Sequence, residues 1–231
     1  MRRVKHIGII ACSAEGAALC YKTICNEGSQ YMGEHAHPEV SLHTHSLHEY
    51  MKFINADNWN EVAELMRSSA RKLVEIGAQI LICPDNTIHR VFALACEGIS
   101  APWLHIAEEV ATAAKCENFR KTGILGTKYL MQSEVYPEAF GKYAISYEIP
   151  EERQRTETNR IIFDELVCGV IKESSRDYLL DVIDDLKAKG CDSVVLGCTE
   201  IPLIVKPEDS RLPVLDSTRI LARAALRTAT E

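Results

Sequence analysis

Two twelve-residue stretches decide how this chain folds: GAQILICPDNTI at residues 77–88 and GCDSVVLGCTEI at residues 190–201. When they are aligned, Gly77 falls on Gly190 and Asp85 falls on Cys198, and both offsets equal 113 (190 − 77 and 198 − 85). In each stretch a glycine follows a helical pattern, an apolar run of strand length comes next, and small polar residues follow the run. Each stretch therefore predicts a helix end, a buried strand and a polar loop, in that order.

The flanking segments repeat in the same order, which indicates an internal duplication. HIGII at residues 6–10 matches KTGIL at residues 121–125, and APWLHI at residues 101–106 matches LPVLDS at residues 212–217. Three ordered matches predict two similar lobes. The first comprises residues 1–106 plus 216–231, and the second, residues 107–215, is inserted before a C-terminal helix that returns to the first.

Short β-branched runs alternate with amphipathic helical patterns along the whole chain. Strands are predicted at residues 6–11, 39–45, 79–83, 103–106, 122–125, 144–149, 193–196 and 213–215, and the clearest helices at residues 60–76, 176–189 and 218–228. Such alternation is typical of mostly parallel sheets with helices on their faces. We therefore expect an α/β fold with two similar three-layer lobes, related by a pseudo-twofold axis, and an active site between them.

Composition limits the classes of function. The net charge of −7 argues against a nucleic-acid partner, and no apolar run approaches the ~20 residues of a membrane span. The N-terminal residues MRRVKH lead into an apolar stretch too short for a signal peptide. Nine cysteines without a CxxC pair indicate reduced thiols. We expect a cytoplasmic protein without nucleic-acid or membrane partners.

Asp85 and Cys198 are the leading candidates for chemistry. Ligands of open parallel sheets bind beyond the carboxyl ends of the strands, and both residues come just after the third predicted strand of their lobe. Two proton carriers on opposite faces of a small chiral molecule can remove a proton from one face and return it to the other. Small polar residues at the strand ends are the expected substrate contacts: Asn86, Thr87, Thr199, Glu200, Cys12, Ser13 and Thr127.

The histidine-rich segment at residues 35–48 suggests a metal site as an alternative. His43 and His45 would share one strand face, and imidazole is a common zinc ligand. No paired cysteine or clear carboxylate set accompanies them, so we predict no metal. We expect His45, near the end of the second strand, to contact the substrate instead.

Three segments resemble motifs of the aspartate/glutamate racemase family. GCTEI at residues 197–201 is similar to the second-cysteine motif, DNTIH at residues 85–89 to the Cys-Asn-Thr-x-His motif, and NRIIFDEL at residues 159–166 to a further family segment. The resemblance runs from about residue 5 to residue 225. It implies an amino-acid racemase without a cofactor, acting on an aspartate-like or glutamate-like substrate as a homodimer. It also implies Cys198 as an acid/base, with Asn86, Thr87 and Thr199 holding the α-carboxylate.

The chain departs from that pattern at three places. Asp85 stands where the family has its first cysteine, and Cys83 lies two residues earlier, before Pro84. ACSAEG at residues 11–16 replaces a glycine-rich loop. Glu157 replaces a lysine that often recognises the distal carboxylate, so it is expected to repel a dicarboxylic substrate.

An aspartate and a cysteine form an unequal pair of proton carriers. A carboxyl group titrates near ~3.9 and a thiol near ~8.5, so at neutral pH Asp85 is the base and Cys198 the acid. The opposite protonation state lies roughly 6 kcal/mol uphill without tuning by the protein. Two alternatives therefore stay open: a one-base isomerase or decarboxylase acting on a small carboxylic acid, and a non-catalytic protein that binds small carboxylates.

Overall fold

The computed structural model describes residues 4–231, so the first three residues of the N-terminal stretch discussed above lie outside it. The chain divides into two compact units: unit 1 runs to Ile106 and resumes at Thr218–Glu231, and unit 2 is Ala107–Ser217. Each unit holds one four-stranded parallel sheet, which confirms the predicted α/β fold class. Within the described residues no helix is both long and apolar enough to cross a membrane.

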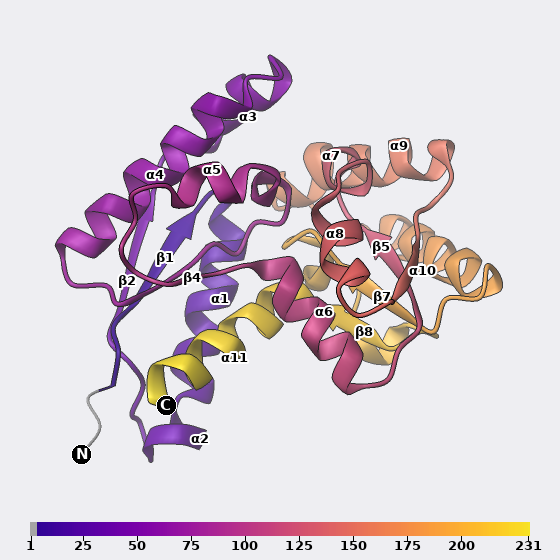
Figure 1. The fold of residues 1–231 in the computed structure, drawn as a ribbon. Coiled ribbons are helices and arrows are strands. Elements are labelled where there is room, and N and C mark those ends of the chain that lie inside the picture. The colour runs from indigo at the N-terminus through magenta and orange to yellow at the C-terminus, as the bar shows by residue number, and fades with distance from the viewer. Residues whose placement is uncertain (1–3) are drawn as a thin grey trace. The chain divides into compact units, whose positions relative to one another are not determined.

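Unit 1 is built on a sheet with the strand order β2-β1-β3-β4. Its strands are β1 (Ile7–Ala11), β2 (Val40–Thr44), β3 (Ile80–Ile82) and β4 (Trp103–Leu104). Its helices are α1 (Ala14–Glu27), α2 (Ser29–Met32), α3 (Leu47–Asn55), α4 (Trp59–Glu75), α5 (Phe92–Cys96) and most of α11 (Ser217–Thr230), with a 3-10 turn at Thr87–Val91. Helices α1 and α11 pack on one face of this sheet (Figure 1), and α4 contacts β1 and β2.

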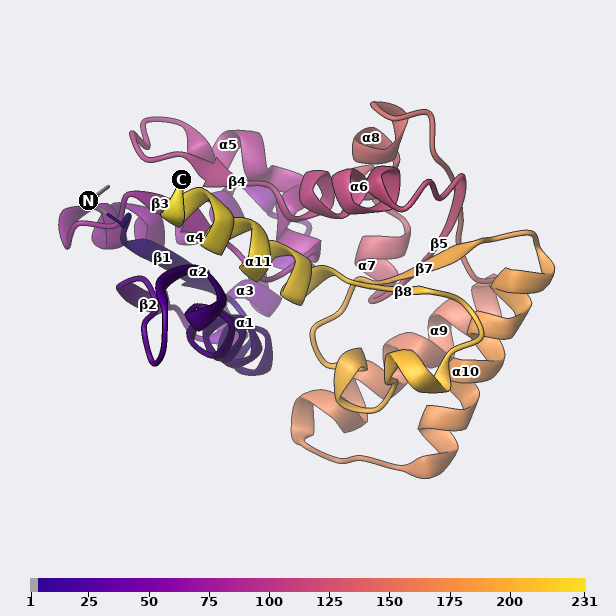
Figure 2. The same ribbon diagram turned by 90° about the horizontal axis from the view of Figure 1, so that it is seen from below.

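Unit 2 repeats this plan with the strand order β6-β5-β7-β8. Its strands are β5 (Lys121–Leu125), β6 (Ser146–Glu148), β7 (Ser193–Leu196) and β8 (Val214–Asp216). Its helices are α6 (Ile106–Cys116), α7 (Lys128–Met131), α8 (Val135–Gly141), α9 (Glu152–Arg160) and α10 (Glu173–Ala188), with 3-10 turns at Leu166–Cys168, Ile201–Leu203 and Pro207–Asp209. Figure 2 shows α6 and α8 on one side of this sheet and α9 and α10 on the other.

The two sheets share a detail that reflects the duplication. A Cβ atom added to Gly8 on β1 would lie 3.2 Å from Leu73 Cβ of α4, and one added to Gly123 on β5 would lie 2.9 Å from Leu186 Cδ1 of α10. Both distances are shorter than ordinary contacts, so each glycine allows a helix to pack closely on the first strand of its sheet. The pairs Gly8–Leu73 and Gly123–Leu186 lie at matching places in the two halves.

The same helices end in the same way. The N–H of Gly77 donates to the carbonyl of Val74 and that of Ala78 to Leu73, while the N–H of Gly190 donates to Lys187 and that of Cys191 to Leu186. This is the Schellman pattern, in which the residue after the helix takes a positive φ. Gly77 has φ +100° and Gly190 has φ +88°, so the glycines predicted to end these helices do so.

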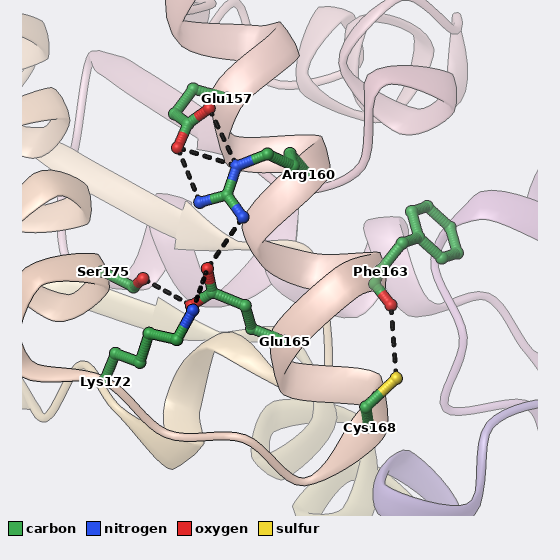
Figure 3. Close-up of polar contacts among 7 residues, drawn as sticks. All are labelled: Glu157, Arg160, Phe163, Glu165, Cys168, Lys172 and Ser175. Carbon is green, nitrogen blue, oxygen red and sulfur yellow. Dashed lines mark hydrogen bonds and ion pairs between the residues drawn. The ribbon is translucent and has the colours of Figure 1, made fainter.

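A buried carboxylate fixes the chain between α9 and α10. After α9 the helix widens into one π-helical turn, Ile161–Glu165, which directs Glu165 inward. Its side chain is only 3% exposed. It accepts hydrogen bonds from Ser175 Oγ at 2.5 Å and Arg160 Nη1 at 2.8 Å, and Lys172 Nζ lies 3.2 Å away (Figure 3). The Ser175 hydrogen bond, followed by that of Arg160, lowers the pKa of Glu165 to about 2.

Gly190→Ala should destabilise the protein by roughly 1–2 kcal/mol, because a Cβ atom is unfavourable in the left-handed backbone conformation. Nothing lies within 4 Å of the added Cβ atom, so the cost is conformational and not steric. Gly141→Ala is the matched control, since its Cβ atom also meets nothing within 4 Å and its residue is helical. Denaturant unfolding should show no loss of stability for the control. Equal losses in both variants would contradict the assignment.

Glu165→Ala should lower the free energy of unfolding by about 2 kcal/mol, because the buried Ser175 hydroxyl loses its acceptor. Asp164→Ala, at the exposed neighbouring position, should change it by less than about 0.5 kcal/mol.

The pH dependence gives a second reading of the same interaction. The pKa of Glu165 falls from 4.5 to about 2 on folding, so its contribution is complete above the unfolded value and is lost as the pH falls toward the folded one. The stability difference between wild type and Glu165→Ala should therefore shrink between these two values. A difference independent of pH across this window would contradict the role of the carboxylate charge.

Candidate active site

Cys12 and Asp85 lie beyond the carboxyl ends of two neighbouring strands. Ile9 of β1 pairs with Ile82 of β3. Cys12 directly follows the last residue of β1, and Asp85 comes three residues after the last residue of β3. The register of β1 with β2, in which Ala11 pairs with Thr44, brings His45 beside Cys12 from the other side. Three of the residues predicted from the sequence therefore share one edge of the first sheet.

Asp85 caps the short turn that follows it. Its Oδ1 accepts hydrogen bonds from the backbone N–H of Thr87 at 3.1 Å and of Ile88 at 3.4 Å. The turn is a 3-10 element, Thr87–Val91, which runs directly into α5. Since its leading N–H groups already bind Asp85, they are not available to a substrate carboxylate in this arrangement.

His89 connects this turn to the start of α6. Its Nε2 accepts the N–H of Ile106 at 3.3 Å, so its proton is on Nδ1, which donates to the carbonyl oxygen of Asp85 at 2.7 Å. Burial, helped by the neighbouring His105, puts the pKa of His89 well below its ordinary value. A neutral imidazole thus fixes the backbone of Asp85.

The other predicted residues of this edge have mixed roles. Asn86 is 2% exposed, and Ser13 caps α1 by accepting the N–H of Gly16 at 3.2 Å. Cys83 is fully buried, and burial, reinforced by Asp85, raises its pKa well above the ordinary value. Burial thus favours the neutral thiol of Cys83.

His45 lies at the carboxyl end of β2, as expected, and its ring is already engaged. Nε2 is 3.3 Å from Ser68 Oγ on α4, and Nδ1 is 3.9 Å from Glu49. Burial, followed by Lys72, lowers its pKa. In the part of the chain that the structure describes, no cluster of three or more His, Cys, Asp or Glu residues is arranged to hold a metal ion.

The second sheet brings together Thr127 and Cys198 in the equivalent way. Leu125 of β5 pairs with Leu196 of β7, so two further residues on each strand lead to Thr127 and Cys198. The intervening glycines allow a close approach: a Cβ atom on Gly126 would lie 3.1 Å from the carbonyl oxygen of Gly197. Thr127 caps α7 through the N–H of Leu130 at 3.2 Å.

Cys198 donates its thiol hydrogen to a buried carboxylate. Its Sγ lies 3.0 Å from Glu200 Oε2, and the hydroxyl of Thr199 donates to the same oxygen at 2.7 Å. The three residues are 7%, 3% and 4% exposed. The sequence predicted Thr199 and Glu200 as substrate contacts; here one carboxylate oxygen of Glu200 accepts hydrogen bonds from both the Thr199 hydroxyl and the Cys198 thiol.

Glu157, the third departure from the family pattern, is paired within its own helix. Arg160 donates to both of its carboxylate oxygens, from Nε at 3.0 and 3.1 Å and from Nη2 at 2.7 Å (Figure 3). The Arg160 hydrogen bond is the main cause that lowers the pKa of Glu157. Its negative charge is thus largely compensated, which weakens the expected repulsion of a dicarboxylic substrate.

Two buried groups near the first edge were not singled out from the sequence. His89 entered the sequence analysis only as the last residue of the DNTIH motif. A histidine four residues after Asp85 is spaced so that its ring can bond the Asp85 carbonyl oxygen across one helical turn. Tyr50 of α3 is fully buried, and Cys12, Cys83 and Asp85 all lie close enough to raise its pKa further, beyond the main effect of burial. The sequence feature that could have indicated Tyr50 is a tyrosine in the first turn of a helix that follows directly after β2.

Glu200→Gln should increase the alkylation rate of Cys198 at neutral pH by about tenfold, because a neutral neighbour no longer disfavours the thiolate. Site-resolved mass spectrometry after timed iodoacetamide treatment would measure this, with the exposed Cys116 as the internal reference. An unchanged ratio of the two rates would show that Glu200 does not control the thiol.

Comparisons with known proteins give the family. The family model described as Asp/Glu/Hydantoin racemase matches residues 7–225. A crystal structure of a candidate Asp/Glu racemase from Yersinia pestis superposes with a TM-score of 0.89 at 33% identity, covering 98% of this chain and all of that one. An aspartate racemase homologue from Pyrococcus horikoshii gives 0.84 at 28% identity, with the same coverage.

A characterised relative agrees with this assignment. The broad specificity amino-acid racemase RacX of Bacillus subtilis is 23% identical over 173 residues, which is 73% of either chain. The family match extends over nearly the whole chain, through both sheets and both candidate edges. The chain belongs to the Asp/Glu/hydantoin racemase family.

Proposed function

We propose that this protein is a cofactor-independent amino-acid racemase that uses Asp85 and Cys198 as its two acid/base groups. Membership in the family supports the reaction class, and aspartate- or glutamate-like amino acids are the first substrates to test. The observation that most favours an active enzyme is the Cys198–Glu200 hydrogen bond, since a buried carboxylate beside a thiol is costly unless it has a use.

The proposed chemistry is two proton transfers at one α-carbon. The Asp85 carboxylate removes the α-proton, and the Cys198 thiol donates its hydrogen to the opposite face. In the resting protein Glu200 accepts a hydrogen bond from the Cys198 thiol. This favours the protonated thiol and therefore the role of Cys198 as the acid. The reverse reaction starts from protonated Asp85 and a Cys198 thiolate.

The polar residues at both edges are assigned supporting roles. The side chains of Asn86 and Thr87, and the backbone N–H groups near Thr199, are proposed to bind the α-carboxylate, with Ser13 and Thr127 holding the helix ends that shape each edge. No cofactor and no metal are required by this scheme.

Two further expectations accompany the function. All nine cysteines are present as thiols in this structure, as a protein of the reducing cytoplasm would have them. A homodimer is expected from the resemblance, and light scattering of the purified protein would measure the assembly state directly.

Racemisation can be tested in heavy water with a panel of L- and D-amino acids that includes aspartate, glutamate, alanine and lysine. Proton NMR would follow loss of the α-proton signal, and chiral chromatography would detect the opposite enantiomer. Asp85→Asn and Cys198→Ala should each reduce racemisation at least about a thousandfold, since each removes one obligatory proton carrier. Cys116→Ala, which removes an exposed thiol of α6, is the control and should keep full activity.

The pattern of loss separates the alternatives. Exchange that survives Asp85→Asn, without the opposite enantiomer, would identify Cys198 as a single base and favour the isomerase or decarboxylase. Binding of an amino acid without exchange by the wild-type protein would favour the carboxylate-binding protein and overturn the proposed function.

A further inference from the structure

Tyr50 carries a buried hydroxyl that has no partner. The residue is 0% exposed, and its phenol oxygen makes no hydrogen bond with any residue between 4 and 231. A buried donor of this kind costs stability, and such groups are rare in folded proteins. A tyrosine is retained there at a cost that phenylalanine, which has the same ring, would avoid.

The surroundings of Tyr50 are those of the candidate site. Burial is the main reason that its pKa is raised, and the next three causes are Cys12, Cys83 and Asp85, which all lie at the carboxyl ends of β1 and β3. Helix α3 begins at Leu47, just after β2 ends at Thr44, and its N-cap is Ser46. Tyr50 is the fourth residue of this helix. The phenol is therefore close to the same edge as Asp85.

The polar groups behind Tyr50 are bonded to one another. Lys72 Nζ, which can only donate, lies 3.0 Å from His43 Nε2, so the neutral His43 carries its proton on Nδ1. Nδ1 lies 2.9 Å from Ser69 Oγ and donates to it. Ser69 makes no hydrogen bond to the Tyr50 phenol, whose oxygen has no partner within residues 4–231.

We propose that Tyr50 is a substrate-binding residue whose hydroxyl donates a hydrogen bond to the carboxylate of a small amino acid bound at the ends of β1 and β3. The ligand supplies the acceptor that the protein itself lacks. A carboxylate is the acceptor class that fits, because the neighbouring thiols are weak acceptors and a phenol–carboxylate hydrogen bond is charge-assisted. This inference deepens the proposed function, on which it rests, by adding a binding residue on α3.

Tyr50→Phe tests the proposal by ligand binding and by activity. Calorimetry with 2-aminoisobutyrate and 2-methylaspartate, which keep the α-carboxylate and lack an α-proton, would measure binding without turnover. The variant should bind the better probe between about tenfold and a hundredfold more weakly, the usual range for a hydrogen bond to a charged group. Where the wild type exchanges α-protons, KM for the substrate should rise by a similar factor.

Thermal unfolding distinguishes a binding role from a structural one. Tyr50→Phe should keep or raise the melting temperature, because an unpaired buried hydroxyl is removed. Tyr136→Phe is the matched control in stability: its phenol is also buried but hydrogen-bonds Ser217, so its melting temperature should fall by roughly 2–4 °C. A similar fall for Tyr50→Phe, with unchanged probe binding, would show that the hydroxyl is structural and overturn the proposal.

The two proposals can fail separately. Wild-type exchange with unchanged binding and KM in Tyr50→Phe would remove Tyr50 from the site and leave the racemase intact. Probe binding that Tyr50→Phe weakens, in a wild-type protein without exchange, would support Tyr50 as a carboxylate-binding residue and overturn the racemase.

Discussion

The parallel register between the first and third strands of each unit determines which side chains share an edge. A shift of β3 by one residue would exchange the side chains on its two faces, because side chains alternate along a strand, and would displace Asp85 relative to the end of β1. Gly8 and Gly123 allow a helix to pack closely on the first strand of each sheet, since an added Cβ atom would lie 3.2 Å from Leu73 Cβ and 2.9 Å from Leu186 Cδ1. The sheets that carry the candidate residues at their strand ends therefore rely on close helix packing at these two glycines.

Buried polar groups separate the scaffold from the candidate site. Glu165 is satisfied by Ser175, Arg160 and Lys172, and its role is complete without a ligand. The Glu200 carboxylate accepts hydrogen bonds from a thiol and a hydroxyl on the two preceding residues, both of which are also candidates to touch a substrate. Tyr50 has no partner at all among the described residues. Glu165 therefore has its full set of hydrogen-bond partners and the Tyr50 hydroxyl has none among the described residues. Buried polar groups without partners are expected where a ligand supplies part of the hydrogen bonding.

The fold could be predicted because its signals are local and repeated. Glycines after amphipathic helices and short β-branched runs gave all eight strands to within a few residues, from β1 at Ile7–Ala11 to β8 at Val214–Asp216. The site could be predicted only in part. The sequence indicates that Cys198 and Asp85 follow strands, but not that Glu200 turns back onto the thiol or that Asp85 caps its own loop. Ile76, the last residue of the helix predicted at 60–76, lies just after α4 as its C-cap and is 62% exposed.

The use of an aspartate and a cysteine as the two acid/base groups has a definite consequence for the proposed reaction. The two enantiomers of an amino acid have equal free energies in water, so unequal acid/base groups cannot change the equilibrium between them. They change how abundant the protonation state is that each enantiomer needs. One reacts with the abundant form, carboxylate and thiol, and the other with the scarce form, which ordinary pKa values place roughly 6 kcal/mol higher. The Cys198–Glu200 hydrogen bond favours the abundant form further. A turnover that starts from the abundant form leaves protonated Asp85 and a Cys198 thiolate. The protons must return to the abundant form before the same enantiomer can react again. The unequal pKa values therefore affect this return step and not the removal of the α-proton.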